Sequence, residues 1–333
     1  MTTKIGVFLP KTQDGDDKQP SIKRLNKLPN EVIDELLALI KCNKEVSLVE
    51  VEDLNNTLIL NGNVFYKNFN LNELDLFFWY SEVRKPNSIS CKSNLYVLEL
   101  LKTLACTVKV IPNPYIFEVA LDKYTAHLTL KQKGVKVSDF ILINNRNLYL
   151  AKPILDKWGY ALLKPRKGSF GKGVTLIDDF SRLRDIIEFI EQERGINLNE
   201  GILLEKYYEN NPQDWLSTTL INGEVMYGYR KKSSRFSNFS NSFESRSFQK
   251  VYDSDEIGGE VDLGDLKQQH QQLASLAYHA ISYEVIGFDM IWHEDHPIIV
   301  DENTFPGLYP NLFKLRNLSL VNSMYQLIVQ ALI

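Results

Sequence analysis

Strand-like and helix-like segments alternate along the first third of the chain, and this alternation constrains the fold more than any other feature. Residues 4–9 are a mostly apolar run typical of a buried strand, and residues 29–41 carry apolar side chains at helical spacing. Residues 45–51 alternate polar and apolar side chains, which predicts a second strand. The pattern continues with a strand at residues 74–80, a helix at 94–104 and a strand at 107–111. Because strands separated by helices build open sheets, this segment predicts an α/β fold.

The chain has 333 residues, which correspond to about two domains at roughly 150 residues each. The pattern changes after the turn signal Pro112-Asn113-Pro114. The following part predicts helices at residues 119–134, 152–158 and 179–194 and strands at 139–143, 160–164 and 174–177. The last part predicts strands at residues 202–205, 216–221, 225–229, 285–292 and 297–301 and helices at 266–282 and 318–332. We therefore expect an N-terminal α/β domain at residues 1–115, a central α+β subdomain at 116–200 and a C-terminal subdomain at 201–333.

Charge and apolar content exclude several classes of function. The net charge is −4, so no basic excess points to nucleic acid as a partner. No apolar run approaches the roughly 18 residues that a membrane span requires, so we expect a cytoplasmic protein without a membrane partner. The three cysteines and five histidines are scattered, in neither CxxC nor HExxH spacing. This pattern argues against a disulfide framework and against a zinc site.

A glycine-rich segment follows the predicted strand that ends at Lys164. Its sequence from residue 167 to 174 is KGSFGKGV, in which three glycines and a serine make a turn whose N–H groups can approach an anion closely. It is not a Walker A loop, because Gly173 rather than serine or threonine follows Lys172. Phosphate binding and a structural turn are equally good interpretations of this segment taken alone.

Carboxylates interrupt an apolar strand pair near the end of the chain. Asp289 lies in the first strand, and Asp301 and Asn303 end the second, after a short turn at residues 293–296. If the strands pair through that turn, the two aspartates share one face, and Asn303 joins them two residues on. Hard oxygen ligands of this kind suit magnesium. The alternative is a hairpin whose acidic side chains are simply solvated.

Taken together and in this order, the motifs resemble those of the ATP-grasp superfamily of carboxylate–amine ligases. The resemblance rests on Asp122-Lys123, on Lys164 with KGSFGKGV, on the ILLE run at residues 202–205 and on GFDM followed by IIVDENTFPG. It is strongest to the branch of RimK-type glutamate ligases and glutathione synthetases, with an ending also similar to D-alanine:D-alanine ligases. It covers roughly residues 75–313 and implies an ATP-grasp fold behind an N-terminal α/β domain. It also implies ATP, two magnesium ions, for which manganese is an alternative, and an acyl-phosphate intermediate.

The resemblance implies a role for each residue of these motifs. The nucleotide phosphates would be contacted by Lys123 and Lys164 and covered by Gly168, Ser169, Gly171 and Gly173. Adenine would be met through backbone groups of Glu205, Lys206, Tyr207 and Tyr208, and the ribose would be held by Asp214 or, as the alternative, Glu209. The metal ligands would be Asp289, Asp301 and Asn303. The catalytic residues would be Lys164 at the transferring phosphate and Arg230 at the acyl phosphate.

The chain departs from the family pattern at several positions. Asp214-Trp215-Leu216 lacks the arginine of the D-x-R pattern, and Asp301 stands where relatives usually have glutamate. The loop expected at residues 231–250 lacks the Asn-x-x-x-Gly-Gly pattern of RimK relatives, and we expect it to order together with the glycine-rich hairpin when ligands bind. Glu82 and Arg84 are a candidate carboxylate-binding pair in the first domain, with an exposed turn as the alternative.

The resulting functional hypothesis is a ligase that joins an amino acid or peptide carboxylate to an amine. Two alternatives are an ATP-grasp kinase that phosphorylates a small molecule and a non-catalytic ATP-binding protein of the same fold. The expected partner is an amino acid or peptide substrate, and a homo-oligomer is left open. The sequence does not name the carboxylate or the amine.

Overall fold

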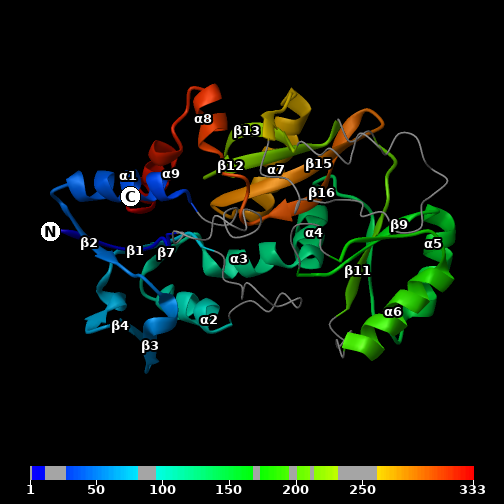
Figure 1. Ribbon diagram of the computed structural model, residues 1–333, viewed down its shortest axis with the longest axis horizontal. Helices are drawn as coiled ribbons and strands as arrows, with labels where there is room; N and C mark the ends of the chain where they lie inside the picture. Colours follow the sequence, from blue (N-terminus) through cyan, green and yellow to red (C-terminus); the bar gives the residue numbers. More distant parts are fainter. Residues whose placement is uncertain are drawn as a thin grey trace, which may run out of the picture.

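The structure is a computed structural model that describes residues 2–11, 28–81, 95–167, 173–194, 201–210, 214–231 and 261–333. The molecule is elongated, with both ends of the chain at one extremity and the unit that carries α5 and α6 at the other (Figure 1). Within the described ranges, no helix combines the length and apolar content needed to cross a membrane.

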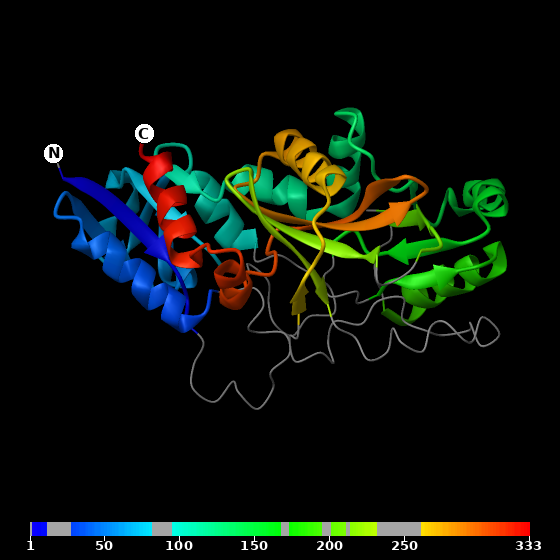
Figure 2. The same cartoon turned by 90° about the horizontal axis from the view of Figure 1, so that it is seen from above.

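The N-terminal sheet is parallel, as the alternation of strands and helices predicts. Its strands, in the spatial order β2-β1-β6-β7, are β2 (Val46–Glu50), β1 (Thr3–Phe8), β6 (Leu76–Trp79) and β7 (Lys109–Ile111). The helices of this part are α1 (Asn30–Cys42) and α2 (Leu95–Leu104). Helix α1 lies beside α9 (Leu320–Ala331), the last helix of the chain (Figure 2). The closing helix therefore packs at the N-terminal end of the molecule.

A small antiparallel sheet absent from the sequence prediction follows β2. It consists of β3 (Thr57–Leu60), β4 (Asn63–Tyr66) and β5 (Phe69–Asn70). The β3–β4 turn is Asn61-Gly62, and both residues have positive φ, 50° and 79°. Asn-Gly is the preferred pair for such hairpin turns, so the local signal for this sheet was present in the sequence.

The central sheet contains one strand that the sequence analysis assigns to the next subdomain. Its antiparallel strands, in the order β10-β9-β11-β8, are β10 (Thr175–Ile177), β9 (Ala161–Lys164), β11 (Ile202–Lys206) and β8 (Phe140–Ile143). Helices α5 (Lys152–Trp158) and α6 (Phe180–Arg194) pack on it and enclose a core of its own. Because β11 pairs with both β9 and β8, the expected boundary at residue 200 moves to beyond Lys206.

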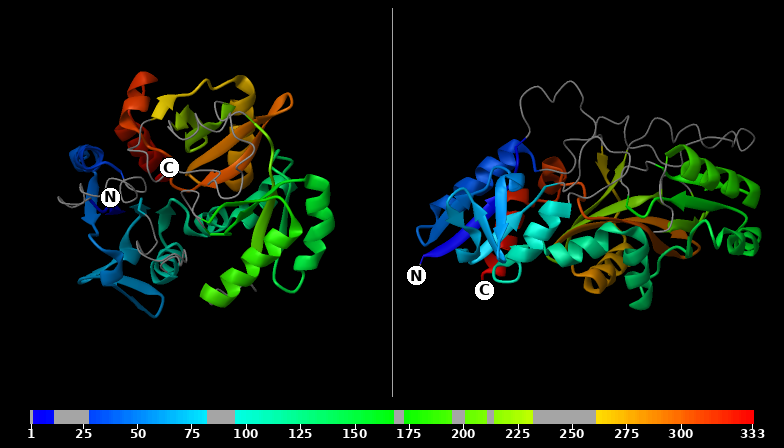
Figure 3. Two further views of the ribbon diagram at one scale, coloured as in Figure 1. Left: turned by 45° about the vertical axis from the view of Figure 1, so that its right-hand side comes forward. Right: turned by 90° about the horizontal axis from the view of Figure 1, so that it is seen from below.

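The C-terminal sheet provides most of the strand-borne candidate site residues. Its antiparallel strands, in the order β14-β13-β12-β15-β16, are β14 (Val261–Leu263), β13 (Glu224–Lys231), β12 (Leu216–Ile221), β15 (Val285–His293) and β16 (His296–Asn303). Helices α4 (Lys123–Gln132) and α7 (Gln268–Ile281) lie against one face of it (Figure 3). Two further helices are α3 (Pro114–Leu121) and α8 (Pro310–Leu315).

The single helix expected at residues 119–134 is two helices, because the chain is extended at Asp122. The backbone of Asp122 has φ −94° and ψ 106°, and its side chain accepts a hydrogen bond from the Thr125 N–H. That side chain caps α4, which therefore begins at Lys123. The break places Lys123 at the first position of a new helix.

The N-terminal and C-terminal sheets share their hydrophobic cores. One core joins Phe77 and Trp79 of β6 to Phe288 of β15 and Ile299 of β16. A second core joins the other face of β6 to β13, α8 and α9. The two sheets therefore form one packed body, and only the central unit has a core of its own among the described residues.

Candidate active site

Strands β15 and β16 bring Asp289 and Asp301 directly opposite each other, as the sequence predicts. The register pairs Asp289 with Asp301 and Gly287 with Asn303, and a bulge follows Asp289. A Cβ at Gly287 would lie 2.5 Å from the Thr218 carbonyl oxygen, so glycine permits this close approach of β15 and β12. Paired residues of antiparallel strands point to the same face, so the two carboxylates share one side of the sheet.

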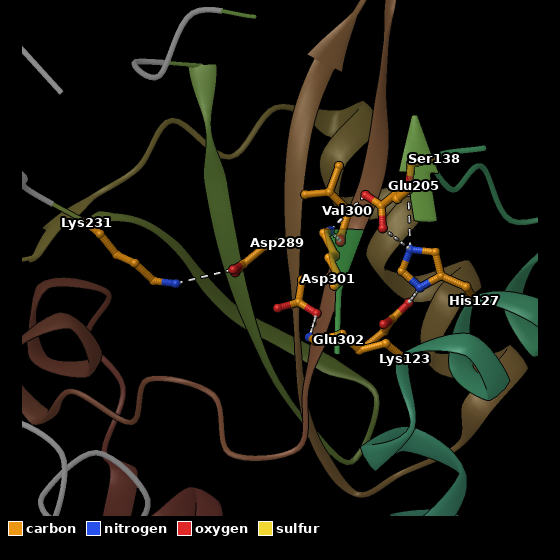
Figure 4. A network of polar contacts seen from close by, with 10 residues as sticks. Lys123, His127, Ser138, Glu205, Lys231, Asp289, Val300, Asp301 and Glu302 are labelled. Atoms are coloured by element: carbon orange, nitrogen blue, oxygen red, sulfur yellow. Dashed lines mark hydrogen bonds and ion pairs between the residues drawn. The ribbon is translucent and has the colours of Figure 1, made fainter. Parts of the chain in front are cut away.

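Two lysines from different elements reach these carboxylates (Figure 4). Lys123, at the start of α4, forms an ion pair with Asp301, and its side chain is almost fully buried. Lys231, at the end of β13, has its Nζ 3.3 Å from Asp289 Oδ2. Burial would raise the pKa of Asp301, but the positive charges of Lys123 and Lys164 hold it below its ordinary value.

Lys123 is fixed by its neighbours in sequence and space. Its backbone N–H donates to the carbonyl oxygen of Arg166 at 2.9 Å. The Arg166 guanidinium in turn pairs with Asp122, with Nη2 2.6 Å from Oδ2. Because Arg166 lies two residues after the end of β9, this contact ties the start of α4 to the strand that carries Lys164.

Lys164 is the buried cation of the central sheet. Its Nζ donates to Glu205 Oε1 at 2.8 Å and to the Val300 carbonyl oxygen at 3.0 Å. Burial would lower the pKa of Lys164, but the charge of Glu205 and of the neighbouring carboxylates raises it above its ordinary value. Burial would raise the pKa of Glu205, but Lys164 and His127 together lower it to about 2. Lys164 and Glu205 are therefore both charged.

His127, one turn after Lys123 on α4, extends this network and was missed by the sequence analysis. Its Nε2 lies 3.3 Å from Glu205 Oε2, and its Nδ1 lies 2.8 Å from Glu302 Oε1 (Figure 4). Two signals in the sequence could have revealed it: the spacing of four residues from Lys123 and the acidic Glu302 next to Asp301. Glu302 and Asp301 are consecutive residues of β16, so their side chains point to opposite faces of the sheet. Glu302 therefore faces α4 rather than the paired aspartates.

The residues expected at the adenine lie at the end of β11, next to the β15–β16 turn. The N–H groups of Lys206 and Tyr207 donate to the carbonyl oxygens of Asp139 and Tyr160. The Tyr208 ring contacts His293 with a centroid distance of 4.6 Å. The carboxylate of Glu205 acts inside the protein, on Lys164 and His127, and the predicted contact with adenine concerns the backbone of this segment.

Arg230 lies on the other face of β13 from Lys231. Its side chain is exposed. Burial lowers the pKa of His270 on α7, and the positive charges of Lys267 and Arg230 lower it further. Successive side chains of a strand point to opposite faces, so the structure brings Lys231 rather than Arg230 to the paired aspartates. Asp214 is exposed just before β12.

Several expected site residues lie outside the described ranges or at their edge. Outside them are Gly168, Ser169 and Gly171, the pair Glu82 and Arg84, and residues 232–250 of the expected long loop. Gly173 is described and has a φ of +79°, which favours glycine. It lies beside Pro165, two residues before the start of β10.

Comparisons with known proteins show the family and the fold of the chain. The family model described as RimK-like ATP-grasp domain matches residues 120–313. A protein named probable alpha-L-glutamate ligase from Xylella fastidiosa (strain M12) is 23% identical over 189 residues, which are 56% of this chain and 56% of that protein. The chain thus spans about half the length of this curated relative.

Two solved structures share the fold along nearly the whole chain. The D-alanine–D-alanine ligase of Bacillus anthracis complexed with ATP has a TM-score of 0.59 at 17% identity, over 99% of this chain and 97% of that one. The ATP-grasp ligase PsnB complexed with a minimal precursor, Mg and ADP has a TM-score of 0.60 at 11% identity, over 98% of each chain. The fold follows from these two structures, and the match of the family model to more than half of the chain shows that it belongs to the RimK-like ATP-grasp family.

Proposed function

We propose that this protein is an ATP-dependent ligase that joins the carboxylate of an amino acid or peptide to an amine. The observation that carries the proposal is the pair of facing carboxylates, Asp289 and Asp301, met by lysines from two other elements. Membership of the RimK-like family supports it, as do the names of the relatives, a probable glutamate ligase among them. PsnB, which shares the fold, binds a precursor together with Mg and ADP.

The donor set at this face fits magnesium. Asp289 Oδ1 is buried and has no hydrogen-bond partner among the described residues, so an oxygen is available to a cation. Asp301 and Asn303 would add a carboxylate and an amide oxygen on the same face. A magnesium pair bound there would neutralise phosphate charge. Lys123 and Lys231, which now meet these carboxylates, would then be available to phosphate oxygens.

Lys123 and Lys164 are proposed as the cations that bind the nucleotide phosphates. They come from two different elements, one from α4 and one from β9, and each is largely buried. Buried lysines with carboxylate partners are held in a single position, so little ordering remains to be done when ATP binds. The glycine-rich residues 168–173 would cover the phosphates, as the sequence predicts.

The proposed chemistry needs no nucleophile from the protein. A substrate carboxylate oxygen attacks the γ-phosphorus of ATP, ADP leaves, and the amine nitrogen then attacks the acyl carbon and expels phosphate. The amine loses a proton in this second step. The chain contributes position and positive charge. Lys164 would contact the nucleotide phosphates, and Lys231 would take the role at the acyl phosphate that the sequence assigns to Arg230.

A product-based screen tests the proposal. Amino acids and short peptides are offered in pairs with Mg·ATP, and ADP release and product masses are recorded. A ligase gives ADP together with a product whose mass is the sum of the two substrates less one water. ADP with a phosphorylated substrate and no condensed product would indicate the kinase alternative. ATP binding without ADP release for any pair would indicate a binding protein and contradict the proposal.

A further inference from the structure

Four charged side chains alternate in sign through the interior between the central and C-terminal sheets. Lys164 contacts Glu205, Glu205 contacts His127, and His127 contacts Glu302. The series crosses from β9 through β11 and α4 to β16, and Figure 4 shows His127 between the two glutamates. The chemistry proposed above uses Lys164 but gives no task to His127 or Glu302.

Glu302 forms a buried pair with His127. The side chains of both residues are 0% exposed, and His127 Nδ1 meets Glu302 Oε1 inside the protein. The imidazole Nδ1 lies 2.8 Å from Glu302 Oε1, and Lys164 also interacts with the Glu302 side chain, so both cations of the series act on Glu302. With His127 positive, two cations balance two carboxylates along the series.

The groups that face His127 come from each element packed around it. They are Glu205 from β11, Glu302 from β16 and the Ser138 hydroxyl, 3.3 Å from Nε2, and the Phe140 ring meets the imidazole edge-on. The Asp301 carboxylate of β16 also interacts with the imidazole, and Lys164 of β9 is connected to it through Glu205. Burial pulls the pKa of His127 down, but the two carboxylates raise it to about 10. The ring is therefore charged at neutral pH.

We propose that His127 is a positioning residue whose positive charge joins the lysine that binds phosphate to the strand that binds metal. Through Glu205 it fixes the partner of Lys164, and through Glu302 it fixes β16 next to Asp301. Lys123 stands one turn earlier on the same helix and contacts Asp301 itself. One helix thus sets the distance between the two lysines and the metal carboxylates. This inference rests on the proposed ATP-dependent function.

The first experiment replaces His127 with glutamine, which keeps polar atoms but removes the charge. We expect His127→Gln to bind Mg·ATP at least about tenfold more weakly than the wild type in calorimetry, with circular dichroism showing a folded chain. The matched control is His279→Gln, an exposed histidine on α7, which should bind as the wild type does. Binding by His127→Gln within twofold of the wild type would overturn the inference.

The second variant separates charge from packing. His127→Gln combined with Glu302→Gln removes the carboxylate that the first substitution leaves unpaired, and we expect it to recover most of the lost ATP affinity. A role of His127 in packing alone predicts no recovery, because the volume of the imidazole is still missing. If His127→Gln does not fold, folding of the double variant with restored ATP binding supports the inference, and failure of both contradicts it.

A measurement without ATP distinguishes failure of this inference from failure of the proposed function. In ¹⁵N NMR spectra of histidine-labelled protein, both ring nitrogens of His127 should remain protonated at pH 8.5, where exposed histidines are neutral. A neutral His127 ring at that pH overturns the inference whatever the protein binds. A wild type that fails to bind Mg·ATP while His127 stays charged contradicts the proposed function alone.

Discussion

Burial decides how much each charged side chain contributes at the candidate site. Lys164 and Glu205 have side chains that are 9% and 1% exposed, whereas Lys131 and Asp139, also an ion pair, are 55% and 50% exposed. Breaking a buried pair leaves a charge without solvent, but breaking an exposed pair returns both groups to water. The two lysines therefore offer a matched comparison.

Lys164→Met should lower both stability and nucleotide affinity. We expect a loss of about 3 to 5 kcal/mol in the free energy of unfolding, because Glu205 loses its nearest cation. Affinity for Mg·ATP should fall by about 10- to 100-fold, the cost of one charged hydrogen bond. Urea unfolding and calorimetry measure the two effects. Lys131→Met should change neither by more than about 0.5 kcal/mol, and equal effects of the two substitutions would contradict the assignment of Lys164.

Glu205 should make stability depend on acid pH. Its pKa falls from an ordinary value of 4.5 to about 2 in the folded chain, so the folded state binds this proton less tightly than the unfolded state. The stabilisation is complete above pH 4.5 and is lost as pH falls toward 2, at about 1.4 kcal/mol per pH unit. Urea unfolding between pH 3 and 7 should show a gap between the wild type and Glu205→Gln that narrows below pH 4.5. The control is Glu188→Gln, a substitution of an exposed glutamate on α6.

At the scale of elements, strands β15 and β16 form the hairpin that displays the paired carboxylates. The sequence alone predicts it, because apolar alternation and a short turn are local signals. Local sequence does not show that Lys231, rather than the predicted Arg230, faces the paired aspartates. A shift of one residue reverses the face of every side chain in a strand, and residues 225–229 show no clear alternation. Strand β11 was misassigned for a similar reason, since its partners β8 and β9 are set by tertiary pairing.

Asp301→Asn should abolish the dependence of ATP binding on magnesium and leave the hairpin folded. The substitution removes a charged oxygen at the end of a strand and little volume. We expect the activation free energy to rise by about 3 kcal/mol, which corresponds to a fall in turnover on the order of 100-fold. The measurements are ADP release and the rise in melting temperature on adding ATP with magnesium or with a chelator. Asp295→Asn, in the exposed turn of the same hairpin, is the control and should behave as the wild type.

At the scale of the whole molecule, the central unit stands apart from a body formed by the other two sheets. Its core involves β8 to β11 with α5 and α6, and few contacts join it to β16. Among them are the hydrogen bonds between Ser138 N–H and the Ile299 carbonyl, between Ile299 N–H and the Lys136 carbonyl, and from Lys164 to Val300. Composition and periodicity do not reveal this division, because it depends on which apolar faces meet.

Nucleotide binding should therefore protect the central unit more than the rest of the chain. ATP held by Lys123 and Lys164 would add contacts across the boundary between the two bodies. In hydrogen-exchange mass spectrometry with magnesium and a non-hydrolysable ATP analogue, peptides from β9 and β11 should slow at least about threefold. Peptides from β1 and β6, buried in the other body, should change less than twofold. Uniform slowing along the chain would contradict this division.

Helix α9 has a consequence for the order in which the chain is made. The core on one face of the first sheet contains Met324, Leu327 and Ile328 as well as Ile5 and Phe78. During synthesis at about 5–20 residues per second, the early strands would wait roughly 15–60 s for these partners to leave the ribosome. Until then α1 alone among the helices of this core covers that apolar face, and the part that α8 and α9 bury later is open to chaperones that act during translation.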